Sequence, residues 1–200
     1  MRRAGLTWSI PSPPSARPTT SGFVEVLPPS GGAGPVGIGL FPEAPLQHPT
    51  LLRGTGIRLM DVTDYAGVGA TRNVHAAAAG DLDGDGDLDL ALLENVTNGV
   101  DGRLVILRNL ASAGNALTVR AQGLGAARDG IGARVEVWVG GRRVVKRVDG
   151  SLSMLANGPN EVHVGLGTAT FADRVIVRFR SGAVVTRTHV PAGRITFAEE

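Results

Sequence analysis

Residues 76–93 read AAAAGDLDGDGDLDLALL, and they hold five aspartates within nine positions. Small alanines precede the aspartates, and leucines at alternate positions (Leu88, Leu90 and Leu92) follow them, as in a strand with one buried face. The stretch therefore predicts an acidic loop between two β-strands. Because like charges this close repel one another, the loop needs something that compensates its charge.

The spacing Asp-x-Asp-x-Asp-Gly-x-x-Asp is typical of a calcium loop. Calcium takes about six to eight oxygen ligands, and carboxylates at every second residue of a tight loop can converge on one ion. Gly86 permits the sharp turn that this requires. Four side chains are expected to bind through carboxylate oxygens and Asp87 through its backbone carbonyl, so the predicted metal ligands are Asp81, Asp83, Asp85, Asp87 and Asp89.

Other interpretations of the aspartates stay open. An EF-hand would need a glutamate at the twelfth position, where Leu92 stands, and helices on either side. The stretch could be an acidic surface turn without a metal. It could also be a magnesium-dependent phosphatase site with Asp81 and Asp83 as nucleophile and acid, although the apolar strand and helix of such a site are not evident.

Composition favours many short strands. The chain has 200 residues, of which 29 are glycine and 12 are proline, and 42% are hydrophobic but only 4% aromatic. A core built from Val, Leu, Ile and Ala is therefore expected. The absence of cysteine excludes disulfides and cysteine-ligated zinc. No apolar run approaches the roughly 18 residues that a membrane span needs, and the N-terminus lacks a clear signal peptide.

The charge is distributed unevenly along the chain. Residues 1–115 hold 8 arginines against 11 acidic residues, whereas residues 116–200 hold 11 arginines and 1 lysine against 7 acidic residues. A basic half could bind nucleic acid. The arginines alternate with apolar residues, however, and no stacking aromatics lie between them. They are therefore interpreted as the solvent face of strands, and no nucleic acid is expected as a partner.

The chain divides into three segments by pattern. Residues 1–55 are rich in Pro, Gly and Ser and are predicted to be mostly irregular or disordered, with one short strand possible at 22–27. Residues 56–112 read as strand, strand, acidic loop, strand, turn and strand, which is the content of one four-stranded propeller blade.

Residues 115–200 are nearly all strand by pattern. Val135, Val137 and Val139 lie on one side of a strand, and the pair Gly140-Gly141 predicts a two-residue hairpin turn after it. Ser181-Gly182 predicts a second tight hairpin. About seven short strands separated by turns indicate an antiparallel β-sandwich or small barrel. The fold class predicted for the chain is therefore all-β.

Two families are similar to parts of this sequence. RLMDVTDYAGVGATRNVHAAAAGDLDGDGDLDLALLENVTNGVDGRLVILRNL resembles the FG-GAP/VCBS repeat of β-propellers, whose calcium loop corresponds to residues 81–89. The segments RDGIGARVEV, VHVGLG and VIVRFRSG resemble the ASPIC/UnbV domain, which ends propeller proteins similar to cartilage acidic protein. The resemblances cover roughly residues 57–200.

These resemblances imply a function without catalysis. They imply a calcium-binding module for adhesion or for interaction with a protein or glycan, in an extracellular, periplasmic or cell-surface setting. A single repeat implies a truncated propeller protein, or a blade that packs against further blades. No catalytic residue is predicted. The alternatives are an accessory or hydrolytic domain of a larger propeller enzyme and an arginine-rich nucleic-acid binder.

Overall fold

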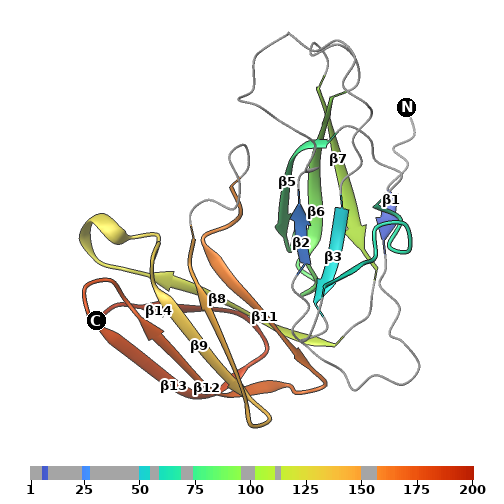
Figure 1. The fold of residues 1–200 in the computed structure, drawn as a ribbon. Helices are drawn as coiled ribbons and strands as arrows, with labels where there is room; N and C mark the ends of the chain where they lie inside the picture. Colours follow the sequence, from blue (N-terminus) through green and yellow to red (C-terminus); the bar gives the residue numbers. More distant parts are fainter. Residues whose placement is uncertain are drawn as a thin grey trace. The chain divides into compact units, whose positions relative to one another are not determined.

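The protein is described here from a computed structural model, which places residues 6–8, 24–27, 50–54, 59–68, 74–95, 102–110, 114–149 and 157–200. These residues form two compact units, the first holding β1 to β7 and the second holding β8 to β14 together with Gly84–Asp87 (Figure 1). Among them no α-helix occurs, and one short 3-10 turn spans Gly125–Ala127. The all-β prediction is confirmed. No helix within this described part is long and apolar enough to cross a membrane.

The first unit contains two small sheets. Strands β5, β6 and β7 form an antiparallel meander, and β1 pairs with β7 in parallel at its edge. Strands β2, β3 and β4 form a separate antiparallel sheet. The strands are β1 (Leu6–Trp8), β2 (Val24–Leu27), β3 (Thr50–Gly54), β4 (Leu59–Asp61), β5 (Val74–Gly80), β6 (Asp89–Asn95) and β7 (Gly102–Asn109).

One apolar core joins the two sheets of the first unit. Leu90 and Leu92 of β6 are fully buried, as the alternating leucines predicted, and they share a cluster with Leu51 of β3. The turn after β4 adds Ala66 and Val68 to the same cluster. The aliphatic pattern of β6 therefore fixes which face of the meander is covered.

Strand β4 does not occupy the place that a four-strand meander would give it. The first strand was expected to precede the meander as a blade strand, but β4 pairs with β3 and all three of its residues are exposed. Thr63 explains this pairing. Its hydroxyl accepts a hydrogen bond from Leu51 N at 2.8 Å and donates one to Asp61 Oδ1 at 2.6 Å, so the turn after β4 is bonded to β3.

Residues 1–55 contain more strand than their composition predicted. The expected short strand is present as β2, and β1 and β3 are additional. Leu51 shows why β3 forms, because its side chain is fully buried, its backbone pairs with Val26 of β2, and its carbonyl accepts a hydrogen bond from Val62 N at 2.9 Å. A Pro- and Gly-rich segment can still hold a strand where another strand offers it hydrogen bonds.

The second unit holds the expected seven strands in two sheets. One sheet has the order β10-β9-β12-β13 and is antiparallel throughout, and the other has the order β11-β8-β14. The antiparallel prediction is wrong at one pair, because β14 runs parallel to β8. The strands are β8 (Asn115–Gln122), β9 (Arg134–Val139), β10 (Arg142–Arg147), β11 (Glu161–Gly167), β12 (Phe171–Arg178), β13 (Val184–Pro191) and β14 (Gly193–Ala198).

A single core lies between these two sheets, so the unit is a sandwich and not a closed barrel. Val135 and Val137 of β9 face Leu117 and Val119 of β8 in one buried cluster, which Phe197 of β14 completes. The predicted hairpin is also present. Val139 pairs with Arg142, and Gly140 and Gly141 between them have φ values of 55° and 78°. Two successive positive φ values are the reason for the glycine pair at this turn.

Candidate metal centre

The acidic loop joins two paired strands. Gly80, the last residue of β5, lies opposite Asp89, the first residue of β6, so the loop leaves and re-enters the meander at one place. Gly84 and Gly86 have φ values of 81° and 94°, which side chains disfavour. The glycine expected to permit the sharp turn is therefore accompanied by a second one, and together they fold the chain back within a few residues.

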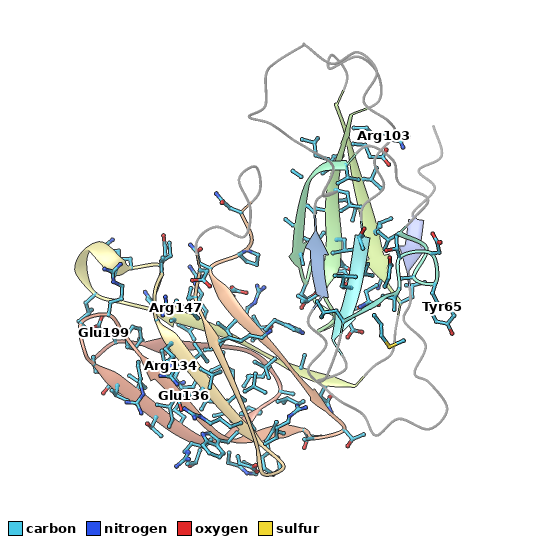
Figure 2. All side chains as sticks on the ribbon, viewed as in Figure 1. Tyr65, Arg103, Arg134, Glu136, Arg147 and Glu199 are labelled. Carbon is cyan, nitrogen blue, oxygen red and sulfur yellow. The ribbon has the colours of Figure 1, made fainter. Side chains whose placement is uncertain are left out.

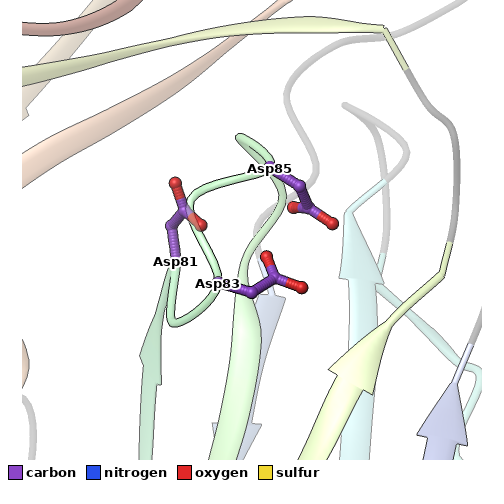
Figure 3. Close-up of side chains that lie close together, drawn as sticks. All are labelled: Asp81, Asp83 and Asp85. Carbon is purple, nitrogen blue, oxygen red and sulfur yellow. The ribbon is translucent and has the colours of Figure 1, made fainter.

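Three of the five predicted ligands come together in this loop. Asp81, Asp83 and Asp85 each offer a carboxylate oxygen, and these oxygens lie within 4.8 Å of one another. Two oxygens bound to one calcium ion can be no farther apart than about 5 Å, twice the bond length. Figure 3 shows the three side chains, with the carboxyl groups of Asp83 and Asp85 turned to the same side of the loop. The separations therefore suit a shared cation.

Asp89 lies outside this cluster. It is 1% exposed, its Oδ1 accepts a hydrogen bond from Asn109 N at 2.8 Å, and its Oδ2 accepts one from Leu82 N at 3.1 Å. The carboxylate thus ties both the start of the acidic loop and the end of β7 to the start of β6. Asp87 is also outside the cluster, and its backbone N–H donates to Asp85 Oδ1 at 2.9 Å.

An arginine that the sequence did not single out compensates part of the negative charge. Arg108, near the end of β7, forms an ion pair with Asp83. The β6–β7 register pairs Leu90 with Leu107, so Arg108 stands one step nearer the acidic loop than the last apolar pair. The register of the β6–β7 hairpin is the signal that could have indicated that Arg108 lies near the acidic loop. Arg108 and a bound cation would compete for the same carboxylate.

His163 of β11 makes contacts within the sandwich. His163 Nδ1 lies 3.2 Å from Thr118 Oγ1, and the backbone oxygen of His163 accepts a hydrogen bond from Lys146 Nζ at 2.8 Å. Burial lowers the pKa of Lys146. The first contact joins the paired strands β8 and β11, and the second joins β10 of the other sheet to β11. Ser151 and Ser153 lie outside the described residues.

The glycine-rich stretch at 123–132 lines a shallow hollow in the second unit. The hollow measures about 260 Å³ and is bordered mainly by apolar groups, including Leu124, Ile131 and Phe179. Leu124 N donates to Glu199 Oε2 at 2.7 Å, which places a carboxylate at the rim. Arg180 and Ser181 also line the hollow, beside Glu199.

The second unit has a recognisable family match. Residues 123–200 match the family described as ASPIC and UnbV, which covers the segments that carried the resemblance in the sequence. No curated protein matches the chain.

Proposed function

We propose that this protein is a calcium-binding interaction module without catalytic chemistry. In this proposal the β5–β6–β7 meander and its acidic loop are an FG-GAP/VCBS-type repeat, and the module works outside the cytoplasm on a protein or glycan ligand. The observation that carries the proposal is the approach of the Asp81, Asp83 and Asp85 carboxylates to within 4.8 Å of one another. The ASPIC and UnbV match of residues 123–200 is compatible with it.

The chemistry of the three side chains supports a hard cation. Carboxylate oxygens are the ligands that calcium prefers, and further positions can be filled by backbone carbonyls and water. A bound cation would neutralise the repulsion between the three carboxylates. The loop would then be fixed between β5 and β6, where Asp89 already holds its base through Leu82 N and Asn109 N.

Calorimetric titration of the full chain with calcium tests this proposal. We expect binding by the wild type and a loss of at least tenfold in affinity for Asp81→Ala and for Asp85→Ala, since each removes one charged ligand (roughly 1.4 kcal/mol per tenfold change). Asp64→Ala, which removes an exposed carboxylate outside the acidic loop, is the matched control and should bind like the wild type.

The same variants separate this proposal from an acidic turn without metal. In a metal-free turn, removing Asp81 relieves repulsion and raises stability, and calcium changes nothing. In a calcium site, Asp81→Ala abolishes the stabilisation that calcium gives. No heat of binding up to millimolar calcium, together with a more stable Asp81→Ala variant, would refute the calcium site.

A further inference from the structure

The outer face of the β10-β9-β12-β13 sheet carries a concentration of arginines. Alternation along β9 sends Val135 and Val137 into the core and turns Arg134, Glu136 and Trp138 to the opposite face. Their partners on β10 and β12 lie on the same face, because cross-strand pairs share a face. This arginine face consists of Arg134, Glu136, Trp138, Arg143, Val145, Arg147, Arg174, Ile176 and Arg178.

One buried carboxylate holds three of these arginines. The Glu136 side chain is 6% exposed, and its Oε2 accepts hydrogen bonds from Arg143 Nε at 3.1 Å and Nη2 at 2.7 Å. Its Oε1 lies 3.4 Å from Arg178 Nε and 3.6 Å from Arg134 Nε. The three arginine side chains nevertheless stay 42–50% exposed. Glu136 therefore positions them without removing them from solvent. Figure 2 labels Glu136 and Arg134 on the sandwich.

Trp138 holds arginines at the other end of the face. The guanidinium carbon of Arg174 lies 4.9 Å from the indole centroid and that of Arg143 lies 5.7 Å from it, both within cation–π range. The indole N–H is buried and has no hydrogen-bond partner within the described residues. Side chains already fixed in place lose little freedom when a ligand binds, so this face is preorganised for anions.

The arrangement suits a polymer with repeated anionic groups. Arg147, Arg134 and Arg178 form one row across the strands, and Arg143 and Arg174 flank Trp138 in another. The rows are four residues apart along β9, about 13 Å at the usual rise of a strand. One small anion cannot reach both rows, but a chain lying along the strand direction can.

We propose that the arginine face binds an acidic polysaccharide bearing carboxylates, a polyuronate. The arginine face carries five arginines and one acidic residue, Glu136. The adjacent Asp173 already accepts a hydrogen bond from Gly140 N at 2.9 Å. The net charge of the face is therefore positive. Guanidinium groups match carboxylates in shape and hydrogen bonding. The exposed Thr186 and Thr188, cross-strand neighbours of Ile176 and Arg174, add hydroxyl groups beside the arginines.

Other polyanions fit this face less well. Single-stranded nucleic acid binds through open aromatic rings, and the Trp138 ring is flanked by two guanidinium groups. Protein interfaces are depleted of glutamate at their centre, where this face has Glu136. The polyuronate would be the ligand of the proposed interaction module, so the inference rests on that proposed role. It does not depend on calcium binding by the acidic loop.

The test is binding of polygalacturonate to the full chain in a calcium-free, chelator-containing buffer, so that the acidic loop and calcium bridging play no part. Calorimetry gives the affinity. Quenching of Trp138 fluorescence reports binding at the arginine face, and the Trp138→Phe variant shows which part of the emission comes from Trp138 and which from Trp8. We expect Arg147→Gln/Arg174→Gln to weaken binding about tenfold, equivalent to ~1.4 kcal/mol. Arg120→Gln/Arg128→Gln removes the same charge outside the arginine face and should bind within about twofold of the wild type.

Three results would overturn the inference. The first is no binding of polygalacturonate, which would leave the calcium titration untouched. The second is an equal loss in both double variants, because net charge alone would then explain binding. The third is tighter binding of duplex DNA, heparin or polyglutamate at equal salt. If the double variant Arg147→Gln/Arg174→Gln fails to fold, the single variant Arg147→Gln decides the question. We then expect its affinity for polygalacturonate to fall about threefold, while the control Arg128→Gln binds like the wild type.

Discussion

Glu136 shows how a single residue organises a surface. It is a buried carboxylate on the outer side of a sheet, and its partners are half-exposed arginines on three strands. Hydrogen bonding by Arg143 is the main reason that the pKa of Glu136 lies below its ordinary value, and Arg178 adds to the effect. The native state is therefore stabilised by the ionised form.

We expect Glu136→Gln to lower the free energy of unfolding by about 1–2 kcal/mol at pH 7, at the low end for charged hydrogen bonds because the arginines are partly hydrated. Since the native pKa lies below the unfolded one, this contribution is present above pH ~4.5 and is lost as the pH falls through the native pKa. Urea unfolding at pH 7 and pH 3 measures both effects.

Glu200→Gln, at the exposed C-terminal residue, is the control for this variant and should match the wild type at both pH values. A wild-type advantage over Glu136→Gln that persisted unchanged at pH 3 would contradict the ionic role of Glu136.

Arg108 compensates part of the negative charge of the acidic loop. Its ion pair with Asp83 must give way or rearrange when a cation binds that carboxylate. We expect Arg108→Gln to tighten calcium binding about threefold to tenfold in the calorimetric titration, because a competing positive charge is removed. Arg128→Gln, with the same charge change in the second unit, should have no effect. Weaker binding by Arg108→Gln would show that Arg108 supports the metal site.

The residue scale also shows what the sequence could and could not reveal about the site. Spacing alone brought Asp81, Asp83 and Asp85 together correctly, because alternate residues of a tight loop are neighbours. It groups Asp89 with them as a metal ligand, but it does not reveal that the Asp89 carboxylate accepts a hydrogen bond from Asn109 N, 20 residues away. Spacing within a motif carries no information about a partner on another strand, and Arg108 was missed for the same reason.

Among the elements, the loop from β8 to β9 packs closely against β8 at Gly130. Gly130 has a φ of 64°, and a Cβ there would lie 2.3 Å from the backbone oxygen of Ala121 on β8. Gly125, in the same loop, has a φ of 61° and open space around it. The two positions share the same backbone strain and differ only in the clash.

We therefore expect Gly125→Ala to cost about 1–2 kcal/mol of stability, the usual penalty of a left-handed conformation. Gly130→Ala should cost more by a further 1–3 kcal/mol or so, as in other overpacked sites. Chemical denaturation of the two variants isolates the clash from the strain. Equal losses would mean that β8 and the loop can separate at no cost.

Elements made by local sequence were predictable, and those made by distant pairing were not. The Gly140-Gly141 turn and the buried valines of β9 follow from neighbouring residues and are confirmed. The partner of β4 is β3, selected through Thr63 and the buried Leu51, and nothing in the β4 stretch itself indicates that choice. The parallel pairing of β14 with β8, far apart in sequence, was missed for the same reason.

For the whole molecule, the decisive feature is that two apolar cores exist. One is built from β3, β5, β6, β7 and the turn after β4, and the other from the strands of the sandwich. No buried residue belongs to both clusters among those described. Each unit therefore has its own source of hydrophobic stabilisation, and each can unfold as a cooperative unit.

The acidic loop leaves β5 and re-enters at β6, and the apolar residues of these two strands belong to the first core. We therefore expect calcium to act on the unfolding transition of that core and not on the other. We expect calorimetry of the full chain to show two unfolding transitions. Excess calcium should raise the free energy of unfolding of one of them by RT ln(1 + [L]/Kd), about 2.7 kcal/mol at a calcium concentration one hundred times Kd. The other transition should stay in place and should be the one that Gly130→Ala lowers, which identifies it as the sandwich. Asp81→Ala should cancel the calcium shift while leaving both transitions visible. A calcium shift of the transition that Gly130→Ala lowers would place the stabilising ion in the sandwich and would contradict the assignment of calcium to the loop between β5 and β6.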